Sequence, residues 1–151
     1  MTKLRDALSR LLYRREHSAY ELAEKLAQKG FVAEEIADEI SHYQQLNLQS
    51  DERFAASILR VRIQQGYGPL KIMHELKAKR VSIDIINCLL SQEEGNWLHY
   101  ATKAWTKKYK NNPVYALEEL QKRQRFLLYR GFSADLVSQL VKTMRIERID
   151  Q

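Results

Sequence analysis

A pattern of apolar positions recurs three times along the chain. The first copy consists of Leu22, Leu26, Gly30, Phe31, Ile36 and Ile40. The second lies 50 positions later and consists of Ile72, Leu76, Arg80, Val81, Ile86 and Leu90. The third lies 101 positions after the first and consists of Leu127, Gly131, Phe132, Val137 and Val141. Each copy places apolar residues at helical spacing on both sides of a turn, which is typical of two consecutive amphipathic helices.

A phrase that recurs at fixed offsets indicates a repeat protein. An acidic residue two places before the Ile or Val anchor recurs as well, at Glu34, Asp84 and Asp135. One repeat cannot bury its apolar face alone, so its neighbours must cover that face. We therefore predict an all-α fold, in which three tandem three-helix repeats, with about nine helices, form an elongated, curved array.

Each repeat begins with a further helix ahead of the shared phrase. We expect these helices at about residues 4–16, from residue 54 to a break at 66–68, and at 97–109. No segment alternates apolar and polar residues as a half-buried strand would. Polar stretches around residues 47–51 and 91–95 divide the chain into predicted repeats at 1–49, 50–94 and 95–151.

Capping residues mark several helix ends. Ser18 and Glu21 have the spacing of a capping box. Gly30 is well placed to end the helix before it in a left-handed conformation. Proline is tolerated in a first helical turn, where its missing N–H is not needed, so we expect helices to start at Pro69 and Pro113. Serine N-caps are expected at Ser82 and Ser133.

The composition narrows the class of protein. Hydrophobic residues make up 44% of the chain, with only five Gly and two Pro, as in a helical soluble protein. We expect no transmembrane helix, because no run of about 18 apolar residues occurs, and no signal peptide. The single Cys88 excludes an internal disulfide and suits a reducing cytoplasm. Cys88 lies in an apolar run, so we expect its thiol to be buried and unreactive.

The positive charge is concentrated at the C-terminal end. Residues 1–50 carry seven Lys/Arg against eight Asp/Glu, and residues 51–95 carry seven against six. Residues 96–151 carry eleven against five, a difference of +6 that equals the net charge of the whole chain. A basic terminal repeat suggests an anionic partner, either nucleic acid or an acidic protein surface. The alternative is a solvated basic face that only aids solubility.

The predicted helix 97–109 separates an apolar face from a basic one. Trp97, Ala101, Ala104 and Trp105 share one side, which is more typical of a core than of a base-stacking surface. A lysine stripe occupies the opposite side, at Lys103, Lys107 and Lys110. This stripe is either a partner surface or a solvated face.

The next helix carries a second candidate surface. We expect its buried stripe to consist of Leu117, Leu120, Leu127 and Leu128. Cations and aromatic residues alternate on the other side, at Lys122, Arg125, Phe126 and Tyr129. Such a patch suits an acidic protein groove, because Tyr and Arg dominate interface hot spots, and it would also suit a nucleic-acid backbone with stacking bases. Alternatively, this face packs on the neighbouring repeat.

Motifs of catalysis and cofactor binding are missing from the sequence. The four His residues never pair with another His or Cys at metal-ligand spacing. The sequence contains neither a glycine-rich phosphate loop nor a nucleophile elbow. We therefore expect no metal site, no cofactor and no enzymatic activity.

Several longer runs resemble the RecX family of bacterial RecA regulators. They are REHSAYELAEKLAQKGF, LQSDERFA, RIQQGYGPLKIMHELKAKRV, NWLHYATKAWTKKY and QRFLLYRGFS. The resemblance spans nearly the whole chain. One departure is Arg80, which stands where the family usually has glycine, and Arg resists a positive φ more than Gly does.

The resemblance implies a regulator without an active site. Such a protein would bind RecA, chiefly as the filament on single-stranded DNA, and would inhibit its recombinase, ATPase and coprotease activities, thereby modulating DNA repair and the SOS response. It would lie in the groove of the filament and act as a cytoplasmic monomer, with at most weak direct DNA binding and no membrane contact. The alternative is a helical DNA-binding protein that acts independently of RecA.

Overall fold

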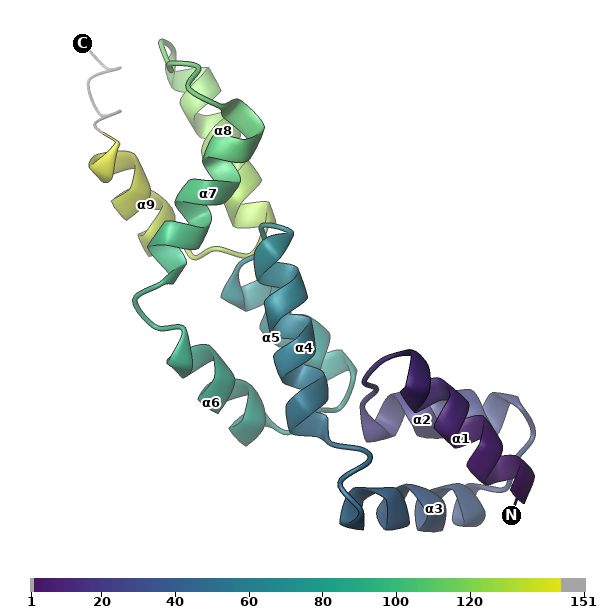
Figure 1. Ribbon diagram of the computed structural model, residues 1–151. Coiled ribbons are helices and arrows are strands. Elements are labelled where there is room, and N and C mark those ends of the chain that lie inside the picture. Colours follow the sequence, from purple (N-terminus) through teal and green to yellow (C-terminus); the bar gives the residue numbers. More distant parts are fainter. Residues whose placement is uncertain (1, 145–151) are drawn as a thin grey trace. The chain divides into compact units, whose positions relative to one another are not determined.

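The protein is all-α, as the sequence predicts. The computed structural model describes residues 2–144, which form nine helices and no strand (Figure 1). The helices are α1 (Thr2–Arg14), α2 (Ala19–Gln28), α3 (Ala33–Gln45), α4 (Asp51–Gln64), α5 (Pro69–Ala78), α6 (Ile83–Gln92), α7 (Trp97–Tyr109), α8 (Leu117–Tyr129) and α9 (Ala134–Thr143). Among the described residues, no helix is both long and apolar enough to cross a membrane.

The chain divides into two compact units. The first unit contains the residues up to Ile58 together with Glu75–Leu89, and the second contains Leu59–His74 together with the residues from Leu90 onward. The division falls inside the middle predicted repeat, so the boundaries at 49/50 and 94/95 stay a prediction. Residues 145–151 of the third predicted repeat lie outside the described residues.

Each unit has its own apolar core. In the first unit α1, α2 and α3 pack around Leu4, Ala7, Leu8, Leu22, Leu26, Ile36, Ile40 and Tyr43. In the second unit α7, α8 and α9 pack around Ala101, Ala104, Trp105, Tyr109, Leu120, Leu127, Phe132, Val137, Leu140 and Val141. The repeated anchors are at most 3% exposed in all three copies, at Leu26, Leu76, Leu127, Ile36, Ile86 and Val137. Their predicted burial is therefore confirmed.

The repeated phrase forms the same turn three times. The amide of Phe31 donates to the carbonyl of Leu26, Val81 donates to Leu76, and Phe132 donates to Leu127, over 3.1–3.3 Å. The residue just before each of these donors has a positive φ, of +95° at Gly30, +61° at Arg80 and +100° at Gly131. This combination is the Schellman motif, in which a left-handed residue ends the helix and an apolar pair closes the turn.

Arg80 adopts the left-handed conformation despite its side chain. A non-glycine residue in this region costs about 1–2 kcal/mol. The Arg80 guanidinium lies 4.8 Å from the centre of the Tyr20 ring, within the first unit. This cation–π contact offsets part of the backbone strain.

The predicted serine caps are present. The Ser18 hydroxyl accepts from the Glu21 amide while the Glu21 carboxylate accepts from the Ser18 amide, which completes the capping box. The Ser133 hydroxyl accepts from Leu136 at the start of α9, and the Ser82 hydroxyl accepts from Ile85 over 3.4 Å.

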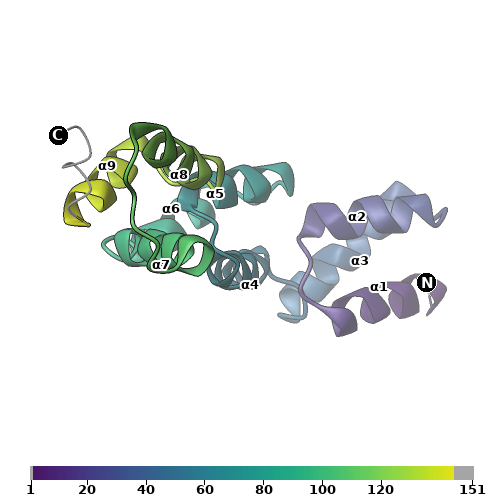
Figure 2. The ribbon, with the colours of Figure 1, turned by 90° about the horizontal axis from the view of Figure 1, so that it is seen from above.

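Three predictions about side chains and helix starts are wrong. The helix expected at Pro113 begins at Leu117, after an irregular connection from α7 that is visible in Figure 2. Leu117 and Leu128 are 48% and 44% exposed, because α8 buries Arg123 between Leu120 and Leu127 instead. Cys88 is exposed, since it lies two positions from the buried Ile86 and hence about 200° round α6.

Within the second unit, the turn before α5 meets the turn after α8 through the backbone. The Gly68 amide donates to the Arg130 carbonyl over 2.7 Å, and the Leu70 amide donates to the Gly131 carbonyl over 3.0 Å. A Cβ on Gly131 would lie 2.6 Å from the Lys71 Cβ, and one on Gly68 would lie 2.6 Å from the Gly131 carbonyl carbon. The approach therefore requires glycine at both positions.

We predict that Gly131→Ala destabilises the protein more than Gly30→Ala does. Both residues have a left-handed φ, but a Cβ on Gly30 would have nothing within 4 Å. Gly30→Ala serves as the control and should lower the free energy of unfolding by about 1–2 kcal/mol from backbone strain alone. Gly131→Ala should lower it by about 1–3 kcal/mol more, because its Cβ overpacks the contact. Urea unfolding followed by circular dichroism measures both losses. Equal losses of unfolding free energy would contradict the close approach of the turn before α5 to the turn after α8.

The first unit contains an ionic cluster around the buried Glu21. Its carboxylate accepts from two Arg15 nitrogens over 2.9 and 3.2 Å, and Lys79 Nζ lies 3.3 Å away. Burial alone would raise the pKa of Glu21, but the hydrogen bonds from Arg15 and Ser18 and the nearby cations lower it to about 2.

His17 lies beside this cluster and is 1% exposed. Its Nε2 is 2.9 Å from Lys25 Nζ, and its Nδ1 is 3.0 Å from the Arg15 carbonyl. An ammonium has no lone pair and must donate, so Nε2 accepts and Nδ1 carries the proton. Burial lowers the pKa of His17, and the charges of Arg15 and Lys25 lower it further, against the effect of the Arg15 carbonyl.

We predict that the first unit loses stability in two steps on acidification. A lowered His17 pKa means that the unfolded chain takes up the proton first, so stability falls as the pH drops below about 6.5. The lowered Glu21 pKa adds stability that is complete above about 4.5 and is lost as the pH falls towards about 2. Melting temperatures across this range measure both steps. His17→Gln should weaken the upper step and Glu21→Gln the lower one, and unchanged pH profiles would refute the assignment.

Candidate functional site

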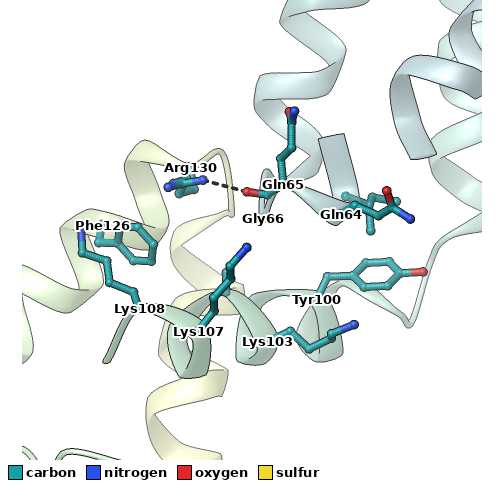
Figure 3. Close-up of a pocket in the computed structure, with 11 residues that line it drawn as sticks. Gln64, Gln65, Gly66, Tyr100, Lys103, Lys107, Lys108, Phe126 and Arg130 are labelled. Atoms are coloured by element: carbon teal, nitrogen blue, oxygen red, sulfur yellow. Dashed lines mark hydrogen bonds between the residues drawn. The ribbon is translucent and has the colours of Figure 1, made fainter. Parts of the chain in front are cut away.

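The second unit contains an open pocket with a volume of about 510 Å³. It is lined by the end of α4 and the turn after it, by one face of α7, and by the C-terminal part of α8 (Figure 3). Ile63, Ala104 and Phe126 supply apolar surface, while Lys103, Lys107, Lys108 and Arg130 supply charge. None of the eleven residues that line this pocket is acidic.

The lysines reach the pocket because they share one side of α7. Lys103 and Lys107 are one helical turn apart, and Lys108 follows directly. The opposite side of the helix is fixed in the core by Ala101 and Trp105, which are 0% and 3% exposed. Figure 3 shows Lys107 pointing towards the turn at Gln65 and Gly66, with Lys108 beside Phe126.

Arg130 is held in place by its backbone and its side chain. Its carbonyl accepts from Gly68, and its Nη1 donates to the Gln65 carbonyl over 2.9 Å. Guanidinium remains protonated in proteins, so this corner of the pocket is permanently positive. A charge that is already positioned loses little conformational entropy when a ligand binds.

Tyr100 adds no negative charge to the pocket. Its hydroxyl donates to Glu93 Oε2 over 2.6 Å. This hydrogen bond, together with burial and the charge of Glu93, raises the pKa of Tyr100. The phenol therefore stays protonated at neutral pH. All charged residues that line the pocket are cationic, and such a lining concentrates the positive electrostatic potential that an anion would meet.

Cations and aromatic rings alternate in one continuous series through the second unit. Each cation lies 4.4–5.9 Å from the centres of two rings. In order, the series consists of Tyr129, Lys71, Tyr67, Arg130, Phe126, Lys108, Tyr109, Arg123 and Trp105. Such contacts contribute about 0.5–1 kcal/mol each at exposed sites, so the series stiffens this side of the pocket.

Arg123 at the inner end of this series is 4% exposed. Its Nε donates to Glu119 over 3.0 Å, and its Nη1 donates to the Asn112 carbonyl over 3.0 Å. A buried charge is tolerated when it is paired and hydrogen-bonded. Arg123 therefore ties the α7–α8 connection to the core and is not available to a partner.

The structure divides the seven residues that the sequence singled out. Lys103, Lys107 and Phe126 line the pocket. Phe126 is half-buried against the core, rather than projecting freely as expected. Lys110 follows the last residue of α7 and is exposed. The other three remain on the exposed surface of α8 and are called the outer α8 set: Lys122, Arg125 and Tyr129.

Sequence reasoning missed Lys108, Arg130 and the turn that carries Gly66. The helical spacing of 100° per residue predicted a lysine stripe on α7 that ends at Lys110. It assigned no role to Arg130, which follows the last residue of α8. A signal was present, because Gly66 and Arg130 both lie in the runs that carry the family resemblance. Those two runs are more than 40 residues apart, and only the folded chain brings them together.

Comparison with protein families identifies the three helical segments. A model of the first three-helix domain of RecX matches residues 5–42, one of the second domain matches 50–90, and one of the third matches 98–141.

Individual relatives are also named as RecX proteins. The chain is 50% identical to the regulatory protein RecX of Legionella pneumophila (strain Corby), over 96% of this chain and 97% of the relative. It is 38% identical to the regulatory protein RecX of Vibrio campbellii, over 89% of this chain and 86% of the relative. The crystal structure of RecX from Lactobacillus salivarius has the same fold, with a TM-score of 0.75 at 20% identity over 99% of this chain and 96% of that chain.

Proposed function

The chain belongs to the RecX family, and we propose that it binds RecA, chiefly as the filament on single-stranded DNA, and inhibits the recombinase, ATPase and coprotease activities of that filament. It would thereby modulate DNA repair and the SOS response. The name of the relatives, a regulatory protein, supports a regulatory role. A cytoplasmic location and action as a monomer remain predictions.

The observation that carries this proposal is the surface of the second unit. It combines a cationic pocket without acidic lining residues and, on α8, exposed cations beside Tyr129, which is 78% exposed. Packing in the core cannot explain why an aromatic residue stands at this exposed position. Tyr and Arg are enriched among the hot spots that supply most of the binding energy of protein interfaces. We propose that the outer α8 set contacts the filament.

We predict that the purified protein slows ATP hydrolysis by RecA on single-stranded DNA at concentrations well below that of RecA. One bound molecule would block the growing end of a filament, so few molecules suffice. A coupled ATPase assay with RecA and circular single-stranded DNA measures the effect. Full activity at equimolar concentrations would count decisively against the proposal.

We predict that Arg125→Ala combined with Tyr129→Ala weakens filament binding about thirtyfold. Truncating hot-spot residues costs about 2 kcal/mol or more, which corresponds to that factor. Both side chains are exposed, so helical content and melting temperature should change little. Titration of labelled filaments measures the affinity.

A matched control removes the same residue types from the first unit. Tyr13 is 93% exposed and Arg14 is exposed at the end of α1, so Tyr13→Ala with Arg14→Ala should bind normally. If the α8 variant unfolds, the outer α8 set is needed for packing within the protein. If the variant folds and binds normally, the filament contact lies elsewhere.

A further inference from the structure

The pocket of the second unit has two chemical requirements that a ligand must meet together. Its rim carries Lys103, Lys107, Lys108 and Arg130, and no carboxylate lines it. Its remaining surface includes Ile63, Ala104 and Phe126, which favour an apolar group. A ligand that fills this site must therefore combine several negative charges with an apolar side chain.

We propose that the pocket binds an acidic peptide segment of a protein partner, with one apolar side chain inside and flanking carboxylates paired with the cations. This inference rests on the proposed function, since the segment would belong to the partner. A volume of about 510 Å³ lies in the usual range of ligand pockets and accommodates a large side chain with its neighbours. Arg130 can bind a carboxylate in bidentate fashion, whereas the lysines act as adaptable point charges.

The aromatic residues argue against single-stranded nucleic acid as the occupant. Proteins that bind single strands depend on open ring faces, on which bases stack. The Phe126 ring is approached by Lys108 at 4.5 Å and by Arg130 at 5.1 Å, and it makes a T-shaped contact with the Tyr109 ring. The Tyr67 ring is likewise approached by Lys71 and Arg130, at 4.8 and 4.9 Å.

The rings of Phe126 and Tyr67 therefore serve to position cations. A phosphodiester backbone would satisfy those cations but would leave Ile63 and Ala104 facing a polar chain. An acidic peptide satisfies both parts of the surface, and the two occupants can be told apart by experiment.

The test compares two probes on one set of variants. The first probe is a labelled short peptide with a central phenylalanine flanked by aspartate and glutamate, and the second is labelled oligo(dT). The pocket variant carries Lys103→Gln and Lys107→Gln. The control variant carries Lys110→Gln and Lys142→Gln, which remove the same charge at exposed positions that neither line the pocket nor belong to the outer α8 set. All four lysines are exposed, so both variants should fold.

We expect the pocket variant to bind the peptide about tenfold more weakly and the control variant to bind within about twofold of the unaltered protein. Tenfold corresponds to 1.4 kcal/mol, the sum expected for two ion pairs at a partly enclosed site. Peptides with asparagine and glutamine for the acids, or with alanine for phenylalanine, should each bind more weakly than the first probe.

Three results of the two binding titrations would overturn the proposal. In the first, the unaltered protein fails to bind the acidic peptide. In the second, the two variants lose peptide affinity equally. In the third, the pocket variant loses oligo(dT) affinity while its peptide affinity is unchanged, which would assign the pocket to single-stranded nucleic acid.

The RecA ATPase assay separates this inference from the proposed function. If the unaltered protein does not inhibit RecA, the proposed function fails, and the peptide titration still reports on the pocket. If it inhibits RecA and the pocket variant inhibits equally well, the pocket takes no part in that contact, and the inference alone is overturned.

Discussion

The close approach of Gly68 and Gly131 determines how the second unit presents its charges. Two backbone hydrogen bonds join the turn before α5 to the turn after α8. They place Arg130 next to the Gln65 carbonyl, to which its side chain donates. A side chain at either glycine would meet atoms 2.6 Å away, so the turns would separate and Arg130 would leave the pocket. Backbone geometry, more than side-chain packing, therefore assembles this site.

Bringing several cations together without acidic partners is unfavourable in itself, because like charges repel. The second unit offsets part of this repulsion with aromatic rings, whose negative faces attract cations. Arg130 lies between Tyr67 and Phe126, and Lys108 lies over Phe126. A ring carries no net charge, so it holds a cation in place without cancelling the positive field that would attract a ligand. An ion pair with a carboxylate would hold the cation but would remove that field.

The sequence predicted the fold far better than the site. Helical periodicity and local capping rules are properties of short segments, and they correctly located α7, the capping box at Ser18 and the left-handed Gly30. Burial on α8 was harder, because Arg123 takes a core position through pairing with Glu119 and Asn112, which periodicity cannot reveal. The pocket was inaccessible to such rules, since it depends on a contact between turns more than 60 residues apart.

The three copies of the turn show that one short sequence motif has different roles in different surroundings. The backbone has a positive φ at Gly30, Arg80 and Gly131 alike, because the Schellman motif requires it. The surroundings differ: a side chain at Gly30 would meet open space, Arg80 contacts Tyr20, and Gly131 lies against Lys71. Glycine at the first position is thus favoured by backbone conformation alone, whereas at the third it also permits a tertiary contact. Since that contact positions Arg130, the proposed binding pocket depends on what surrounds the third copy of the turn rather than on the turn itself.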